Sequence, residues 1–202
     1  MYTLYYMQGA CSLATQVILH ELGQDVRIID KNNVDDFSAI NPVGTVPVLG
    51  DGDHQLTEGA AIILHLLNKH ENSLFPNNND EQQKAIEDIM FANATMHPAY
   101  SKLFFIAQNI SDESARLEAF NAVAKTINNL WRVVESKLAS RDLLEKYSLS
   151  AADIMLTVYE NWGQYFPVDL IVGERTARML TTVRSMPSFK KSVLAEETES
   201  AK

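Results

Sequence analysis

Cysteine is nearly absent from this sequence: Cys11 is the only one in 202 residues, so an internal disulfide is excluded. The cysteine and the five histidines show no zinc-ligand spacing, and we predict no metal site. Long apolar runs are missing too, because the longest, about residues 60–67, contains His65 and is too short to span a bilayer. The start, MYTLYYMQGA, lacks the basic stretch and apolar core of a secretory signal. These absences predict a protein of the reducing cytoplasm with no membrane partner.

Positive charge is also scarce. The chain has 17 Lys and Arg against 26 Asp and Glu, a net charge of −9. Residues 1–79 are the more acidic part, with three basic residues against nine acidic ones. Such a surface is not built to neutralise phosphates, so we predict no nucleic-acid partner. An anionic ligand in this part must be held by backbone amides, a helix N-terminus or one or two local cations.

The order of the expected elements divides the chain into two parts. The expected elements of the first part are a strand at 2–7, a helix at 12–22 closed by Gly23, a strand at 26–30, a short helix near 35–40, a hairpin of strands at 46–49 and 54–57, and a helix at 58–70. After the stretch FPNNND, the expected elements are helices at 81–107, 112–138, 150–165 and 170 to the end. We therefore predict an α/β domain, residues 1–79, followed by an all-α helical domain, residues 80–202.

Cys11 lies between the strand that ends near Met7 and the helix that begins at Ser12. Unpaired amides and the positive end of the helix dipole favour thiolate over thiol at such a place, which predicts a lowered pKa and a reactive sulfur. The alternative interpretation is a small buried hydrophobic residue. A second redox cysteine three residues further on is missing, since that position is Ala14. Any disulfide of Cys11 must therefore involve an outside thiol.

Two further segments of the first domain have patterns that suit a peptide ligand. In NPVGTVPVL, Pro47 begins an apparent strand, which indicates either a simple turn or a cis Val46–Pro47 bond. The cis form would leave the Val46 backbone pointing away from the sheet, where it can pair with an extended peptide. In LTEGAAII, Glu58 begins the apolar helix and serves either as a helix cap or as a ligand for an ammonium group. Gly59 allows a ligand carboxylate to approach the first helical amides.

Together these segments resemble the glutathione S-transferase family, most closely its bacterial, cysteine-containing beta class. The likeness extends over essentially the whole chain, with GACSL, NPVGTVPVL, LTEGAAI and Ser-x-x-Asp-Ile in this order. It implies a thioredoxin-like N-terminal domain that binds glutathione and an all-α C-terminal domain that contributes the electrophile site. It also implies that Val46 and Pro47 bind the cysteinyl part of glutathione, that Glu58 and Gly59 hold its γ-glutamyl end, and that Cys11 faces its sulfur.

The helical domain contains a segment, TMHPAYSKLF, that is similar to the beta-class stretch from which a His-Lys pair reaches the active site. His97 is retained, but Pro98 stands where the family has the lysine. We therefore assign the cation for the glycyl carboxylate of glutathione to Lys31 or Lys102. The alternative for His97 is a buried histidine with satisfied hydrogen bonds, and Pro98 is expected to kink its helix.

Later helices supply a folding motif and an aromatic cluster. Ser150-Ala-Ala-Asp153 is a capping box, to which we assign no catalysis. The apolar stripe that follows it belongs mainly to the core. Some of its aromatic residues, with others from the TMHPAYSKLF helix, are candidates for an electrophile pocket: Tyr100, Phe104, Tyr159 and Trp162.

The resemblance implies a cytoplasmic, homodimeric glutathione transferase of detoxification, which conjugates the thiol of its co-substrate glutathione to small apolar electrophiles without a metal. Its candidate catalytic residues are Cys11, Ser12 and His97, with Tyr5 as an extra donor. Two alternatives stay open: an oxidoreductase in which Cys11 forms a mixed disulfide with glutathione, and a non-catalytic binding or regulatory protein that has kept the fold.

Overall fold

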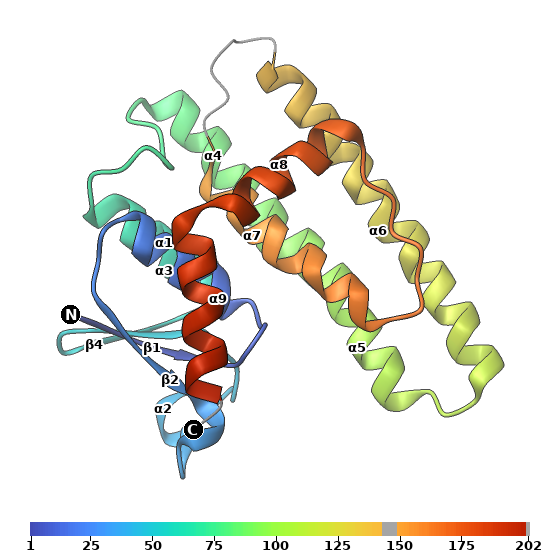
Figure 1. Cartoon of the computed structure of the whole chain (residues 1–202), viewed down its shortest axis with the longest axis horizontal. Coiled ribbons are helices and arrows are strands. Elements are labelled where there is room, and N and C mark those ends of the chain that lie inside the picture. Colours follow the sequence, from blue (N-terminus) through green and yellow to red (C-terminus); the bar gives the residue numbers. More distant parts are fainter. Residues whose placement is uncertain (143–148, 201–202) are drawn as a thin grey trace.

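The computed structural model describes residues 1–142 and 149–200, and its first part is a four-stranded sheet with helices packed on it (Figure 1). The elements of this part are β1 (Tyr2–Tyr6), α1 (Ser12–Glu21), β2 (Val26–Asp30), η1 (Lys31–Asn33), α2 (Phe37–Ile40), β3 (Val48–Asp51), β4 (His54–Thr57) and α3 (Gly59–Lys69). The predicted strands and helices are confirmed, and the short 3-10 turn η1 is an addition. Gly23 ends α1 as expected, with a φ of 65° that favours glycine. β3 begins after Pro47, which has no N–H to donate to the sheet.

The strand order in the sheet is β2-β1-β3-β4, with β1 parallel to β2 and β3 antiparallel to its two neighbours. In β1, Leu4 pairs with Ile28 on one side and with Leu49 on the other. The parallel pair requires a crossover connection, which α1 provides. The helix therefore begins at the carboxyl end of β1, and Cys11 lies at this junction.

The second part is helical. Its elements are α4 (Asn79–Phe91), the π-helical turn η2 (Ala92–Met96), α5 (His97–Asn109), α6 (Glu113–Asp142), α7 (Ala151–Glu160), the 3-10 turn η3 (Asn161–Tyr165), α8 (Glu174–Ser185) and α9 (Pro187–Ser200). Figure 1 shows α5 and α6 side by side and antiparallel, and α9 beside α1. An α/β part followed by a helical part is thus confirmed, whereas the boundary between residues 79 and 80 stays a prediction.

Three predicted helices are interrupted in the structure. The helix expected at 81–107 is divided into α4 and α5 by η2, which ends directly before the pair His97-Pro98. Proline lacks an amide hydrogen, and its ring clashes with the carbonyl four residues earlier. We expected a kink at Pro98; in the structure the π-helical turn η2, which is wider than an α-helical turn, accommodates the proline. The helix expected at 150–165 continues after Glu160 as η3. The helix expected from 170 begins at Glu174 and is broken at Pro187, where α9 starts.

α1 is packed on two opposite sides. Eight of its ten residues are buried. On the sheet side, Leu19 belongs to a small core with Leu4 and Leu49. On the other side, Leu13 and Val17 belong to the large core that contains most of the buried residues of the helical part. The N-terminal and helical parts therefore share one hydrophobic core, which fixes their relative position around the start of α1.

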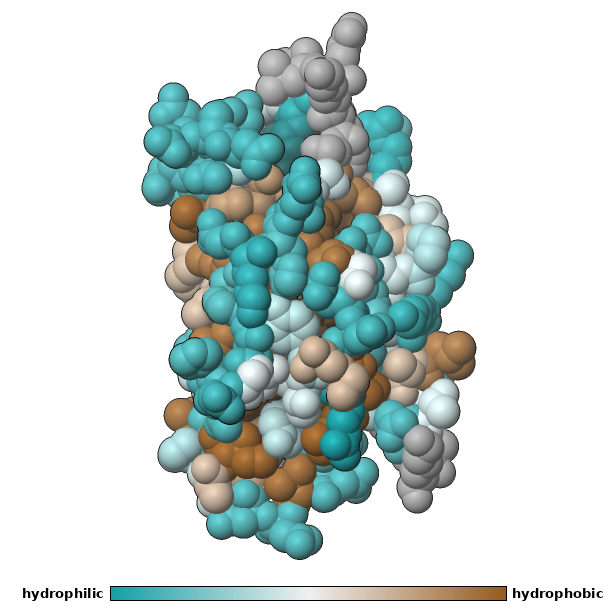
Figure 2. Space-filling view, turned by 90° about the vertical axis from the view of Figure 1, so that its left-hand side faces the viewer, coloured by the Kyte–Doolittle hydropathy of each residue, from teal (hydrophilic) through white to brown (hydrophobic). Residues whose placement is uncertain are grey.

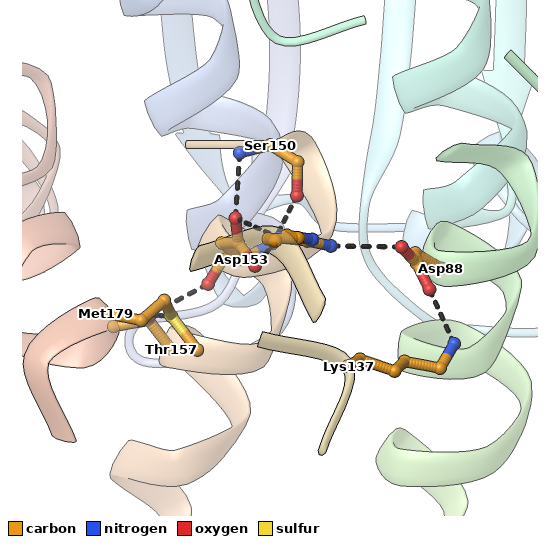
Figure 3. Close-up of polar contacts among 7 residues, drawn as sticks. Asp88, Lys137, Ser150, Asp153, Thr157 and Met179 are labelled. Atoms are coloured by element: carbon orange, nitrogen blue, oxygen red, sulfur yellow. Dashed lines mark hydrogen bonds and ion pairs between the residues drawn. The ribbon is translucent and has the colours of Figure 1, made fainter. Parts of the chain in front are cut away.

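The predicted capping box at the start of α7 is confirmed and extends into an ion-pair network (Figure 3). The Ser150 amide donates to Oδ2 of Asp153 at 2.9 Å, and the Asp153 amide donates to the Ser150 hydroxyl at 3.3 Å. The same carboxylate accepts two bonds of 2.9 Å from Arg141 on α6. Arg141 also binds Asp88 of α4 at 3.0 Å, and Lys137 binds Asp88 at 2.5 Å. The network joins α4, α6 and α7, in agreement with the folding role given to this motif.

Within the described residues, none of the helices is long and apolar enough to cross a membrane. On the face that Figure 2 shows, hydrophilic side chains cover much of the surface and separate the groups of apolar ones.

Candidate active site

A cavity of about 380 Å³ lies between the N-terminal part and the helical part of the chain. One wall consists of the loop of residues 7–11, which follows β1, together with Lys31 and residues 44–46. The opposite wall comes from α5 and η3, and its side chains are His97, Ser101, Phe104, Trp162 and Tyr165. A concave site at the junction of two structural units, with apolar walls and a few polar groups, is typical of a small-molecule site.

Cys11 is the residue before α1 and lines the cavity, but its electrostatic environment differs from the prediction. Its thiol donates a hydrogen bond to the carbonyl oxygen of Val46, at 3.3 Å. Burial raises the pKa of the thiol to about 11, which outweighs the backbone amides of Cys11 and Ser12 that favour the thiolate. The charge of Glu58 raises the pKa further. The prediction of a lowered pKa is therefore wrong, because desolvation at this helix start is stronger than the attraction of the amides.

The Val46–Pro47 peptide bond is cis, as one of the two interpretations of NPVGTVPVL predicts. Val46 lines the cavity, and its carbonyl oxygen is the acceptor for the Cys11 thiol. Pro47 is buried behind this wall, where its Cγ would lie 3.7 Å from a Cβ placed on Gly59. Gly59 therefore lies next to the cis proline without lining the cavity itself.

Glu58 is exposed and precedes α3, yet its side chain does not cap the helix. Its φ is 67°, the only positive φ of a non-glycine residue among those that the structure describes. This backbone region is unfavourable for residues with a side chain. The carboxylate thus lies at the start of the helix without a capping hydrogen bond, and it is near Cys11, whose pKa its charge affects.

Two predicted donors do not reach the cavity, and one of the two candidate cations does. Ser12 is fully buried, and its hydroxyl donates to the backbone oxygen of Met7 at 3.4 Å. The ring of Tyr5 packs on Phe37, with centroids 5.8 Å apart. Lys31 lines the cavity and donates to the Gly44 oxygen at 3.0 Å, whereas Lys102 is exposed and outside the lining.

The helical wall is formed by rings in edge-to-face contact. The ring of His97 lies 5.1 Å from those of Tyr159 and Trp162, and Phe104 lies 5.9 Å from Trp162. Burial lowers the pKa of His97, so this side chain is neutral at pH 7. The indole of Trp162 donates to the carbonyl of Gly9 at 2.7 Å, which ties the helical wall to the loop on the other side.

Tyr100 and Tyr159, which we predicted in the electrophile pocket, lie behind its wall. Tyr100 is fully buried, and its hydroxyl accepts a bond of 2.9 Å from the indole of Trp131. Tyr159 is only 2% exposed and supports the rings of His97 and Trp162. Both are buried core residues outside the cavity lining, although Tyr159 lies close enough to Cys11 for the charge of that sulfur to raise its pKa beyond the effect of burial.

Sequence reasoning missed Ser101 and Tyr165, as well as the loop of residues 7–10. Ser101 lies one turn after His97, and Tyr165 lies three residues after Trp162, so helical spacing from the predicted residues would have indicated both. The loop follows a strand that precedes a helix, which is a frequent place for ligand contacts in α/β proteins. Gly9 and Ala10 belong to the GACSL motif, but we gave a role in the site only to Cys11 and Ser12 of that motif.

This chain is similar to several known proteins that are named glutathione S-transferases. The family described as "Glutathione S-transferase, N-terminal domain" matches residues 5–74. Glutathione S-transferase GstA of Escherichia coli is 35% identical over 111 residues, and the match spans 50% of this chain and 55%, about half, of that relative. Glutathione S-transferase GST-4.5 of Xanthomonas campestris is 26% identical over 173 residues, which cover 83% of this chain and 85% of the relative.

Two solved structures share the fold over nearly the full chain. A sphingomonad glutathione S-transferase complexed with glutathione is 27% identical, with a TM-score of 0.82 and coverage of 96% of this chain and 98% of that one. A bacterial beta-class glutathione S-transferase of Sphingomonas chungbukensis is 25% identical, with a TM-score of 0.80 and the same coverage.

The raised pKa of Cys11 predicts slow alkylation. A pKa of about 11 in place of 9.0 leaves about a hundredfold less thiolate at pH 7.5. A more basic thiolate is about tenfold more nucleophilic, so the net rate with iodoacetamide should be about tenfold below that of a model cysteine. Intact-mass measurement over time gives the rate, and the protein in denaturant is the control because it has no other cysteine. Labelling of the native protein as fast as the control would contradict the raised pKa of Cys11.

Proposed function

The chain belongs to the glutathione S-transferase family of enzymes, and we propose that it conjugates the thiol of glutathione to small apolar electrophiles. The observation that carries the proposal is the cavity between the two parts of the chain. One of its walls presents Cys11, the Val46 backbone and a cation, and the other presents aromatic rings. A peptide thiol and an apolar molecule can therefore meet in one site.

Glutathione suits the N-terminal wall. The backbone of Val46 pairs with the cysteinyl part, which places the ligand's sulfur near Cys11. The Glu58 side chain makes no capping hydrogen bond to its own helix, and it binds the γ-glutamyl ammonium, with Gly59 beside it. Lys31, which lines the cavity, binds the glycyl carboxylate in place of the lysine that the family has at the position of Pro98. The sphingomonad relative complexed with glutathione supports this ligand.

The attacking sulfur in this proposal belongs to glutathione. Cys11 is a thiol at neutral pH, so its S–H can move from the Val46 oxygen to the ligand's sulfur and stabilise the glutathione thiolate there. Formation of a mixed disulfide instead requires the Cys11 thiolate, because the thiolate is the reactive species in thiol–disulfide exchange. The raised pKa therefore favours the transferase over the oxidoreductase.

The electrophile occupies the aromatic wall of Phe104 and Trp162, with His97 and Tyr165 at its edges. His97 is neutral, so this wall has no fixed positive charge and suits uncharged, apolar molecules. From the family resemblance we also propose a homodimer, a cytoplasmic location and a role in detoxification. Gel filtration with light scattering tests the dimer directly.

Glu58→Gln should weaken glutathione binding by roughly tenfold or more, because a charge-assisted hydrogen bond contributes about 1.5–3 kcal/mol. Calorimetric titration of glutathione measures the change. Glu71→Gln, which alters an exposed carboxylate just after the same helix, is the matched control and should bind normally. Glu58→Gly should lose the same affinity while raising Tm, because glycine adopts a φ of 67° without strain. An unchanged Kd for Glu58→Gln would exclude this residue from the glutathione site.

Phe104→Ala should raise the KM for an apolar electrophile about tenfold and leave the KM for glutathione within twofold, because it removes ring contact area from one wall only. Steady-state conjugation of 1-chloro-2,4-dinitrobenzene gives both constants. Phe105→Ala is the matched control, since Phe105 is the next residue on α5 but is 65% exposed. Equal effects of the two variants would place the electrophile elsewhere.

A further inference from the structure

An acidic side chain from the far end of the chain contacts the loop that forms the N-terminal wall of the cavity. Glu196 lies on α9 and is only 2% exposed. Its Oε2 accepts a hydrogen bond of 2.9 Å from the backbone amide of Gly9. Its Oε1 is buried without a hydrogen-bond partner among the described residues. A buried carboxyl that is only half satisfied is costly, and this one is not part of the folding motif at α7 or of the glutathione contacts proposed above.

Both the amide and the carbonyl of Gly9 form hydrogen bonds with side chains of the helical part. Its amide donates to Glu196, and its carbonyl accepts from the indole of Trp162 at 2.7 Å. Its φ of 69° belongs to the left-handed region, so the loop turns sharply at this residue. The amide of Ala10 then returns to the Met7 carbonyl at 3.0 Å, and Cys11 follows directly. Two contacts from the helical part thus determine where this turn, and the thiol after it, lie.

We propose that Glu196 is a positioning residue of the active site, which acts from α9 through the Gly9 amide on the loop of residues 7–11. The proposal rests on the proposed function, since the loop is a wall of the glutathione site. Figure 1 shows α9 beside α1, against which it packs, so the C-terminal helix lies next to the N-terminal part. The C-terminal helix is therefore a component of the glutathione site without touching the ligand.

The charge state of Glu196 should affect how firmly the loop is held. Burial raises the pKa of Glu196 to about 7, against the Gly9 amide that lowers it, and the charge of Asp30 on β2 raises it further. A carboxylate is a stronger acceptor for an amide than the protonated acid is. The loop should therefore be held more firmly above pH 7 than below it.

Of the titratable groups on the elements packed against α9, Arg27 of β2 is exposed, and three others have their own partners. Tyr6 of β1 donates its hydroxyl to the Glu196 backbone oxygen at 3.4 Å. His20 of α1 binds Ser192, one turn earlier on α9, at 2.9 Å, and its pKa is lowered by burial and then by Lys191. Arg184 of α8 binds Asn161 at 2.8 Å. Asp30 of β2 is the charged neighbour that raises the pKa of Glu196 beyond the effect of burial.

The test compares three variants with S-methylglutathione as the ligand, since this thioether has no thiol that titrates. Glu196→Met removes the acceptor at similar size and should raise Kd about tenfold at pH 8. Glu196→Gln keeps a neutral acceptor and should bind about as wild type does at pH 6.5, which is roughly threefold more weakly than wild type at pH 8. Glu197→Gln, an exposed carboxylate on the same helix, is the control. Wild type and control should bind about threefold more tightly at pH 8.5 than at pH 6.5, and Glu196→Gln should show no such change.

A ligand-free measurement tests the contact itself. In wild type, the Gly9 amide resonance in 15N-labelled protein should titrate with a midpoint near pH 7, and in Glu196→Gln it should not. Thermal stability gives a second measurement. The raised pKa of Glu196 stabilises the folded state at low pH, so the Tm of wild type should fall as the pH rises through 7. The Tm of Glu196→Gln should not show this fall. These two measurements decide the proposal even if Glu196→Met does not fold.

Several outcomes overturn the inference. A wild-type Gly9 resonance that does not titrate, or that titrates equally in Glu196→Gln, shows that the carboxyl does not act on the loop. Binding by Glu196→Met that equals the control shows that the contact does not position the site. If wild type does not bind S-methylglutathione at all, the proposed function fails, and the Gly9 titration alone then decides whether Glu196 holds the loop.

Discussion

The burial of α1 between the sheet and the helical part is the constraint on which the rest of this structure depends. Leu19 on one side and Leu13 with Val17 on the other place the helix in both hydrophobic clusters, and eight of its ten residues are buried. A helix packed on two sides cannot move without disrupting both cores. Its first turn is therefore a fixed point, and the cavity forms where that turn meets α5 and η3.

The same burial determines the chemistry. At an exposed helix start, amides and the helix dipole lower a thiol pKa, but here desolvation is the largest effect and Cys11 stays protonated. A protonated cysteine is a hydrogen-bond donor, so the site is suited to stabilise a thiolate that arrives with the ligand. The loop before Cys11 is fixed by Trp162 and Glu196, which belong to the helical part. The single site is thus formed by both parts, because the helical part holds the loop that carries Cys11.

The sequence allowed prediction of those features that depend on local patterns. Gly23 at the end of α1 and the capping box at Ser150 follow from residues within one turn of each other, and both are confirmed. The family resemblance predicted that Cys11, Val46 and His97 share one site, and all three line the cavity. Several other features that depend on contacts distant in the sequence were predicted wrongly or missed. The pKa of Cys11 depends on burial by other elements, the hydroxyl of Tyr100 is taken by Trp131, and Glu196 lies 187 positions from Gly9.

The role of the Cys11 sulfur is the central claim, and the conjugating activity of Cys11→Ala tests it most directly. If the glutathione sulfur attacks and Cys11 only donates a hydrogen bond, kcat/KM for 1-chloro-2,4-dinitrobenzene should fall by about tenfold or less, since a neutral hydrogen bond contributes about 1 kcal/mol. Cys11→Ser, which keeps a donor, should recover part of that loss. Complete loss of conjugation in both variants, with a dinitrophenyl adduct on the Cys11 sulfur of wild-type protein during turnover, would contradict the account and make Cys11 the nucleophile.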